Sequence, residues 1–199
     1  MVFFIFCFYF GKILAYVPLM IFFPTKVIGK QNLPKNQSVI VVCNHLSWVD
    51  ILILWMYIPG FRRFVAKEQV GKWWSKGFVS AIGTVFLDRE GADLKAIKRC
   101  IAVLKKGQSL NIFPEGTRNR NGTTLQPIKR GVAMFAIKGN ATVVPVIIKE
   151  KSRIFKKNSV QIGQPIKFEQ YNGKCSKDNL NAATEQIKNS LLKTQKMIN

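Results

Sequence analysis

An almost uninterrupted apolar run at the N-terminus constrains this chain more than any other feature of its sequence. Residues 2–23 are apolar except for Gly11, Lys12 and Pro18. As a helix, this run would be roughly as long as the hydrocarbon core of a bilayer is thick. A buried helix of a soluble protein would need a thick shell of protein around it, which a chain of 199 residues does not obviously supply. The run therefore predicts a membrane-anchoring segment, which we place at residues 1–30.

Two arrangements of this anchor stay open. A straight span would bury Lys12 near the middle of the bilayer at a cost of about 2.5 to 3.5 kcal/mol. The alternative is an in-plane or re-entrant segment from which Lys12 reaches the headgroups. No basic segment precedes the run and no small-residue cleavage site follows it, which argues against a cleaved signal peptide. Lys26 and Lys30 follow the run and, by the positive-inside tendency, predict that the rest of the chain lies on the cytoplasmic side.

The charge and the cysteines narrow the choice of partners and compartment. With 31 Lys and Arg against 10 Asp and Glu, the formal net charge is +21, which attracts nucleic acid, anionic lipid or a phosphorylated cofactor. No nucleic-acid-binding motif is visible, and an apolar anchor is out of place in a soluble binder. We therefore expect an anionic membrane surface as a partner and no nucleic acid. The four cysteines have neither zinc-site spacing nor the pattern of a disulfide framework, which indicates a reducing compartment.

After the anchor, short β-branched runs alternate with amphipathic stretches. We expect strands at residues 38–43, 64–67, 84–88, 109–113 and 143–148. We expect helices from about residue 50 to about residue 57 and at 92–106, 129–138 and 179–197. Gly107 is expected to cap the helix at 92–106. This alternation favours an α/β fold, one layered domain over residues 31–199 whose mostly buried mixed sheet is flanked by helices. The Lys-rich segment 149–157 is expected to be a solvated loop that faces anionic lipid.

The single histidine of the chain, His45, must serve any reaction that needs an imidazole near neutral pH. Asp50 follows five positions later, a step that turns two side chains of one regular helix away from each other. The two side chains meet only if His45 precedes a helix and Asp50 lies in its first turn, as the predicted strand-to-helix junction allows. The carboxylate would then hold one ring nitrogen and leave the other to take a proton from an alcohol. Alternatively, Ser47 and Asp50 form a capping box and His45 is an ordinary loop residue.

A second group of polar residues follows the strand predicted at 109–113. Gly116 lets the backbone come close to a ligand, and Thr117 and Arg118 offer a hydroxyl and a forked cation that suit a phosphate. Glu115 would repel a phosphate unless it pairs with a cation or accepts from a sugar or glycerol hydroxyl. Alternatively, Glu115 pairs with Arg118 and stiffens a turn.

An arginine and a proline lie at informative positions in or next to two other predicted strands. Arg89 lies at the end of the strand predicted at 84–88, where the alternative to a ligand contact is a surface salt bridge with Asp88. Pro145 lies inside the strand predicted at 143–148. A proline removes a donor from the strand ladder, so this residue indicates an edge position or the start of a strand.

In this order and spacing, four segments resemble the glycerolipid acyltransferase family, whose members include lysophosphatidic acid acyltransferases. The resemblance covers residues 39–148 and rests on Asn44-His45 with Ser47 and Asp50, Gly83 with Phe86 and Arg89, the run from Phe113 through Arg118, and Val144-Pro145. It implies that His45 is a general base oriented by Asp50. It implies a glycerophosphate site made of Arg89, Glu115, Gly116, Thr117 and Arg118. It also implies an acyl-CoA or acyl-carrier-protein donor and no metal or other cofactor.

The sequence thus predicts a membrane-associated acyltransferase of phospholipid synthesis, in which an acceptor hydroxyl attacks a thioester directly and no covalent acyl-enzyme forms. We expect lysophosphatidic acid as the acceptor and phosphatidic acid as the product, because Arg89, Arg118 and the positive field suit a dianionic phosphate better than a zwitterionic headgroup. Within the family, another lysophospholipid or glycerol phosphate is the alternative acceptor. In a different class, the alternative is a non-enzymatic basic protein that binds membrane surfaces.

Overall fold

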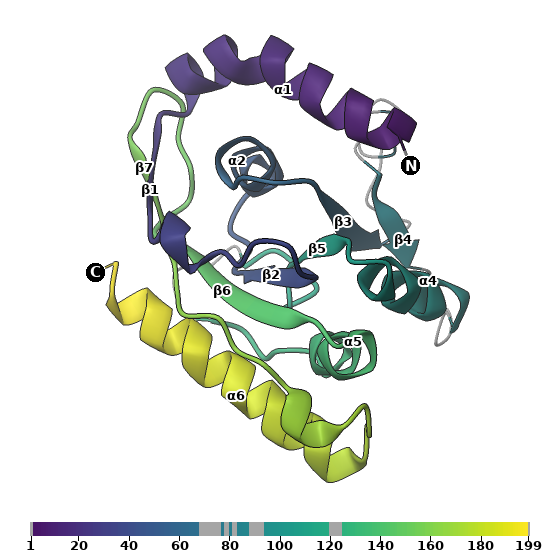
Figure 1. Ribbon diagram of the computed structural model, residues 1–199. Helices are drawn as coiled ribbons and strands as arrows, with labels where there is room; N and C mark the ends of the chain where they lie inside the picture. The colour runs from purple at the N-terminus through teal and green to yellow at the C-terminus, as the bar shows by residue number, and fades with distance from the viewer. Residues whose placement is uncertain are drawn as a thin grey trace.

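A single mixed sheet organises the computed structural model, which describes residues 2–67, 77, 80, 83–87, 94–119 and 125–198. Within these ranges, seven strands are arranged in the order β1-β7-β6-β2-β5-β3-β4 (Figure 1). They are β1 (Thr25–Ile28), β2 (Val39–Cys43), β3 (Arg62–Lys67), β4 (Val85–Leu87), β5 (Ser109–Ile112), β6 (Thr142–Ile148) and β7 (Asn158–Ile162). Neighbouring strands are parallel except β6 and β7, which are antiparallel. The predicted mixed sheet is therefore confirmed.

Helices cover both faces of this sheet. They are α1 (Val2–Phe22), α2 (Val49–Tyr57), α4 (Leu94–Lys105), α5 (Gly131–Gly139) and α6 (Lys177–Lys196), with short 3₁₀ turns η1 (Lys30–Asn32) and η2 (Glu169–Tyr171). Side chains at Val39, Val41 and Cys43 of β2 pack with α1 and α2, whereas Ile40 and Val42 pack on the side of α4, α5 and α6 (Figure 1). A strand buried on both faces shows no alternation of polar and apolar residues, which is why β2 is apolar throughout. The layered α/β fold is confirmed.

Two strands escaped prediction, and both lie at one side of the sheet. The polar strand β7 has the sequence NSVQI, in which Asn158 and Gln161 are buried although they are amides. The Asn158 amide donates to the carbonyls of Pro24 and Lys156, so its polarity is satisfied by the main chain. Strand β1 pairs with β7, and the sheet thus begins inside the range 1–30 assigned to the anchor. A search for apolar or alternating residues cannot detect a strand in which buried amide side chains bond to the backbone.

Pro145 corrects the prediction of an edge position or a strand start. Strand β6 lies inside the sheet between β2 and β7, and Pro145 occupies its middle. On the side of β7, however, the ladder is interrupted between the bridge of Val143 with Ile166 and the pair of Val146 with Ile162. Because N–H groups alternate sides along a strand, the missing donor of Pro145 falls on that side, within the interruption. Its carbonyl accepts from Gly163 N at 2.8 Å.

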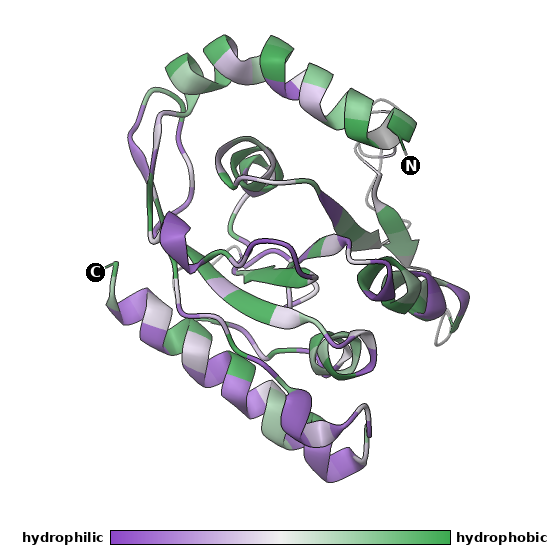
Figure 2. Cartoon of the chain, viewed as in Figure 1, coloured by the Kyte–Doolittle hydropathy of each residue, from purple (hydrophilic) through white to green (hydrophobic). Residues whose placement is uncertain are grey.

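Helix α1 crosses over the C-terminal end of α2, which Figure 1 shows nearly end-on, and it leaves its own outer face uncovered (Figures 1 and 2). Residues 5–22 form a helix that is long and apolar enough to cross a membrane, and 6% of that window is buried by protein. Its inner face makes defined contacts with the protein. The ring of Phe8 meets the ring of Trp55 edge-on with centroids 6.0 Å apart, and Lys12 Nζ donates to Ile58 O at 3.4 Å. A side chain at Gly11 would approach the Trp55 ring to 3.1 Å. Helix α1 is therefore part of the fold as well as an apolar surface.

Candidate active site

His45 and Asp50 meet at the carboxyl edge of the sheet, between the end of β2 and the first turn of α2. Nδ1 of His45 lies 3.0 Å from Oδ2 of Asp50. Asp50 is fully buried, and the His45 side chain is 11% exposed. His45 precedes the helix and Asp50 lies in its first turn, which is the geometry that the sequence required. With Nδ1 engaged by the carboxylate, Nε2 is the ring nitrogen that can face an acceptor hydroxyl.

The same carboxylate also makes the bond to Ser47 N that a capping box requires, in the turn that leads into α2. Oδ2 of Asp50 accepts from Leu46 N at 2.6 Å and from Ser47 N at 2.7 Å, and Ser47 Oγ accepts from Val49 N at 3.3 Å. The capping role and the orienting role were alternatives in the sequence, and the structure combines them in one oxygen. The backbone donors hold the carboxylate in place, and the carboxylate then fixes the orientation of the imidazole.

Phe113 adds a second constraint on the imidazole. Its ring stacks on the ring of His45 with centroids 3.9 Å apart and planes inclined by 16°. A stacked aromatic ring blocks rotation out of the plane that Asp50 selects, and its electron-rich face is favourable for an imidazolium. The sequence placed Phe113 in a motif but gave it no role, because stacking depends on how two distant loops meet.

Glu115 supports the main chain of His45. Its Oε1 accepts from His45 N at 3.1 Å and its Oε2 accepts from Gln126 N at 3.1 Å, while Asn119 N donates to His45 O at 2.7 Å. Burial raises the pKa of the Glu115 carboxyl, and these two backbone hydrogen bonds act in the opposite direction. Among the described residues, no ion pair joins Glu115 to Arg118. Both carboxylate oxygens thus contact protein, so the structure assigns this residue a supporting contact that the sequence did not suggest.

The side chain of Asn44, the residue before His45, binds the backbone of Ile148 at the end of β6. Its Nδ2 donates to Ile148 O at 3.0 Å, and its Oδ1 accepts from Ile148 N at 2.8 Å. This side chain therefore reproduces a pair of strand-to-strand hydrogen bonds one residue beyond the end of β2. In the sequence, Asn44 stood out as part of the Asn44-His45 motif and as a polar residue directly after an apolar strand, but its partner lies 104 positions away.

Gly116 and Thr117 lie in the loop after β5, directly after Glu115, which contacts the main chain of His45. Gly116 has φ +68°, and a Cβ there would lie 2.8 Å from Cε of Lys129, so both the backbone conformation and the approach of the lysine favour glycine. Thr117 is exposed, and its Oγ1 donates to Oε1 of Gln126 at 3.2 Å. The predicted close approach at Gly116 is thus occupied by a cationic side chain of the same chain.

Arg118 stacks on the exposed ring of Trp48. The guanidinium carbon lies 4.3 Å from the centroid of the Trp48 ring, which is 51% exposed and directly precedes α2. A cation–π contact of this kind leaves the N–H donors along the edge of a guanidinium able to bind other ligands. Arg89 and Asp88, the other predicted pair, lie outside the described residues.

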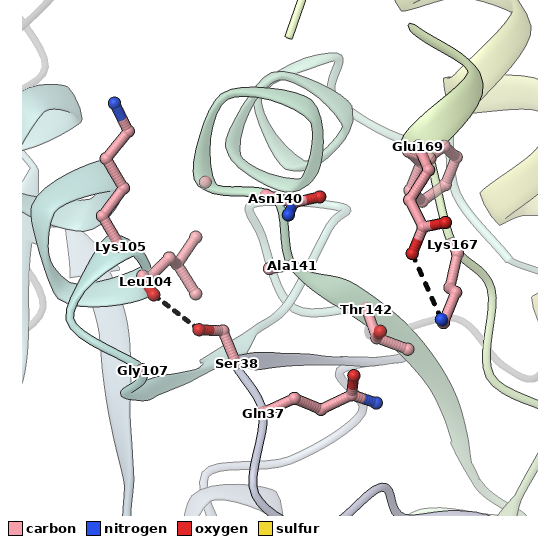
Figure 3. Close-up of a pocket in the computed structure, with 12 residues that line it drawn as sticks. Gln37, Ser38, Leu104, Lys105, Gly107, Asn140, Ala141, Thr142, Lys167 and Glu169 are labelled. Atoms are coloured by element: carbon pink, nitrogen blue, oxygen red, sulfur yellow. Dashed lines mark hydrogen bonds and ion pairs between the residues drawn. The ribbon is translucent and has the colours of Figure 1, made fainter. Parts of the chain in front are cut away.

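A polar hollow of about 400 Å³ lies far from this pair, at the opposite edge of the sheet (Figure 3). It is lined by residues at the amino ends of β2 and β6, among them Ser38 and Thr142. Lys167, on its rim, is paired with Glu169 at 3.1 Å. Because the histidine follows the carboxyl end of β2, this hollow is no part of the site around His45.

Known proteins are similar to this chain in sequence and in architecture. The family model described as Acyltransferase matches residues 24–149, a range that contains His45, Asp50 and the loop through Arg118. The 1-acyl-sn-glycerol-3-phosphate acyltransferase of Bacillus subtilis (strain 168) is 32% identical over 169 residues, which are 81% of this chain and 83% of that relative. The chain spans less of two other curated relatives. For the enzyme of Borreliella burgdorferi the identity is 33%, over 67% of this chain and 54% of the relative. For the alpha enzyme of Homo sapiens it is 32%, over 62% and 44%.

A solved structure extends the similarity beyond the matched segments. The crystal structure of the 1-acyl-sn-glycerophosphate acyltransferase from Thermotoga maritima superposes with a TM-score of 0.69 at 27% identity. The superposition covers 96% of this chain and 78% of that chain. The similarity therefore includes the helical layers as well as the sheet.

Proposed function

This chain belongs to the acyltransferase family, and on that premise we propose that it transfers an acyl group from a thioester to the free hydroxyl of 1-acyl-sn-glycerol 3-phosphate. The product would be phosphatidic acid. One observation carries the proposal: the buried pair of His45 and Asp50 stands where the strand-to-helix junction turns Nδ1 toward the carboxylate. The acceptor is inferred from the names of the curated relatives and from the cationic loop beside the pair.

The proposed mechanism is direct attack by the acceptor. Nε2 of His45 takes the proton of the acceptor hydroxyl while its oxygen attacks the thioester carbonyl carbon. The tetrahedral intermediate then collapses, the carbon–sulfur bond breaks, and the thiolate leaves with the proton returned by the imidazolium. Asp50 stabilises the imidazolium that exists between these steps, and Phe113 keeps the ring in plane. The mechanism needs no covalent acyl-enzyme, metal or other cofactor.

We assign the acceptor phosphate to the loop that ends at Arg118. Arg118 supplies donors along the edge of its guanidinium while Trp48 holds its face, and Thr117 adds a hydroxyl. Lys129, which crosses Gly116, brings a further positive charge to the same loop. Arg89 stays in the proposal as a second arginine for this phosphate. The positive field of the chain, +21 in total, supports an anionic acceptor and a donor on acyl-CoA or acyl-carrier protein, both of which carry phosphate.

We further propose that α1 attaches the domain to a bilayer by lying in its surface. Contacts with the C-terminal end of α2 are spread along the inner face of α1. They extend from Phe8, near the start of α1, to Leu19, whose carbonyl accepts from the Tyr57 hydroxyl at 3.2 Å. A perpendicular span would carry α2 into the hydrocarbon with it. Lys12 also faces the protein, so an in-plane helix can present its apolar outer face to acyl chains without burying this charge in lipid. The domain would lie on the cytoplasmic side, as Lys26 and Lys30 suggest.

Release of free thiol from acyl-CoA and from acyl-carrier protein tests the proposal. Lysophosphatidic acid, lysophosphatidylcholine and glycerol 3-phosphate would serve as acceptors in parallel. We expect thiol release with lysophosphatidic acid well above that with the other two. His45→Ala provides the matched background, because it retains the fold and lacks the base. Preferential release with either of the other acceptors would overturn the assignment of the acceptor and leave the chemistry in place.

A further inference from the structure

The loop between β6 and β7, residues 149–157, ends in an exposed apolar tip. Ile154 is 58% exposed and Phe155 is 65% exposed. The side chains around the tip are charged and exposed: Lys149, Lys151, Arg153, Lys156 and Lys157 are cationic, and Glu150 is the one carboxylate of the segment. Apolar side chains surrounded by cations are typical of elements that enter the interface of anionic bilayers. The sequence predicted the basic character of this loop, and the structure adds the tip.

The backbone of the tip has an unfavourable conformation that turns an aromatic ring outward. Phe155 has φ +59°, in the left-handed region that residues with a Cβ rarely adopt. Its N–H donates to the carbonyl of Phe22, the last residue of α1, at 2.7 Å. The Phe155 residue is nevertheless 65% exposed. Packing within the chain therefore does not account for an aromatic residue at this position.

The tip continues the apolar outer face of α1. The rings of Phe155 and Phe22 lie 5.3 Å apart, and Phe22 is itself 44% exposed. One further main-chain bond, from Asn158 N to Pro24 O at 2.7 Å, fastens the end of the loop to the residues after α1. In Figure 1 the loop rises against the C-terminal end of the helix. A surface that receives α1 thus also meets Ile154 and Phe155.

The loop leaves the sheet at the edge that carries the histidine. Strand β6 ends at Ile148, whose N–H and carbonyl are both held by the side chain of Asn44. Asn44 directly precedes His45 in the chain. A contact made by the loop is therefore only a few residues from the proposed general base.

We propose that Ile154 and Phe155 insert into the interface of an anionic bilayer as a second attachment point beside α1. This inference rests on the attachment of α1 proposed above. A single in-plane helix leaves a domain free to roll about the helix axis, and a second contact removes that freedom. Because the loop belongs to the edge that carries His45, the restricted orientation keeps the proposed active site near the bilayer that contains the acceptor.

A fluorescent label at the tip tests the insertion in the full chain. Cys7→Ala and Cys175→Ala remove the two partly exposed thiols, since Cys43 and Cys100 are buried. Ile154→Cys then carries a nitrobenzoxadiazole label, and Gln170→Cys, exposed in η2 near the opposite edge of the sheet, carries it in the matched control. Each protein is reconstituted from detergent into vesicles of phosphatidylcholine with phosphatidylglycerol. We expect iodide quenching to fall severalfold at position 154 and to stay unchanged at position 170.

Sedimentation of the same vesicles separates the possible failures. If the protein sediments while the label at position 154 stays as accessible to iodide as the label at position 170, the loop does not insert and the attachment by α1 stands. If the protein remains in the supernatant, the attachment by α1 fails and this inference fails with it. In either case thiol release on a soluble short-chain acceptor still reports whether the enzyme assignment holds.

A pair of variants tests the consequence for turnover. Ile154→Ser combined with Phe155→Asn removes the apolar tip, and asparagine tolerates the left-handed backbone. We expect turnover of bilayer-embedded acceptor to fall about tenfold, since two half-exposed apolar side chains no longer enter the interface. Turnover of a short-chain soluble acceptor should stay unchanged, and Ile154→Leu with Phe155→Leu should restore the bilayer reaction. Equal losses on both acceptors would indicate a structural defect and overturn the proposal.

Discussion

Separate changes to His45 and Asp50 should affect activity and stability in different ways. His45→Ala removes the proposed base and leaves the bonds from Leu46 N and Ser47 N to Asp50 in place. Asp50→Asn keeps one oxygen for those two donors but loses the negative charge. Its amide nitrogen would take the position of Oδ1, which is buried and has no hydrogen-bond partner in the described part of the chain. The structure therefore predicts a stability cost for Asp50→Asn and almost none for His45→Ala.

The magnitudes follow from these contacts. General-base catalysis contributes about a hundred- to ten-thousand-fold, so kcat of His45→Ala should fall by that factor. A hydrogen bond to a charged group stabilises a protein by about 1 kcal/mol more than a neutral one. The two backbone donors on Oδ2 thus predict a loss of about 2 kcal/mol for Asp50→Asn, which lowers the Tm of a domain of this size by about 4–8 °C. Asp50→Asn should also lose most of kcat, because the negative charge that stabilises the imidazolium is gone.

Thiol release and thermal unfolding of both single variants and the double variant would measure these effects. The double variant should be scarcely slower than His45→Ala, because an orienting carboxylate has no effect once the imidazole is gone. Its Tm should equal that of Asp50→Asn, since the capping bonds do not depend on the imidazole. Multiplicative losses of kcat in the double variant, or substantial turnover by His45→Ala, would refute the mechanism and require another base.

Three other changes test further parts of the structure. Arg118→Lys should raise the acceptor KM about tenfold with little change in the donor KM, and Trp48→Leu should raise it about two- to fivefold, both measured by thiol release; unchanged KM values would remove Arg118 from the acceptor site. Glu115→Gln should lower kcat, because one of the two N–H donors, from His45 or Gln126, loses its acceptor. Burial raises the pKa of Glu115, so its contribution to stability is fully present below the unfolded pKa and is lost as the pH rises through the folded value. The Tm of the wild type should therefore rise relative to the Tm of Glu115→Gln as the pH falls. A difference in Tm that does not change with pH would argue against the raised pKa. The full chain should stay with membranes through a high-salt wash, since salt does not screen apolar burial, and complete release would count against attachment by α1.

The catalytic pair could be predicted because its geometry is local. Five positions separate His45 from Asp50, and a helix that begins between them is enough to bring Nδ1 to the carboxylate. Strands β2 and β6 were predictable for a similar reason, because burial on both faces leaves a largely continuous apolar run. The overlap of cap and dyad in Asp50 was also visible in the spacing, although the sequence presented the two roles as alternatives.

The remaining contacts around the histidine depend on segments far apart in the chain. Phe113 and Glu115 reach His45 only because β5 lies next to β2, and no local pattern fixes that register. Strand β7 escaped prediction because its buried amides donate to backbone carbonyls, which a search for apolar runs does not reveal. Pro145 was expected at an edge or a strand start because a proline cannot donate to a ladder. The interruption between Ile162 and Ile166 removes the need for that donor, and only the folded sheet reveals it.

The double contact between Asn44 and Ile148 has a consequence for insertions and deletions. One residue more or fewer in the second half of β6 would present a different peptide unit to Asn44 and move the proline away from the gap in its ladder. A lengthened strand has no neutral register, because both anchor points would have to shift together. Length changes should thus be excluded from the second half of β6, because the fixed spacing between Pro145 and Ile148 keeps both the proline and the peptide unit held by Asn44 in place.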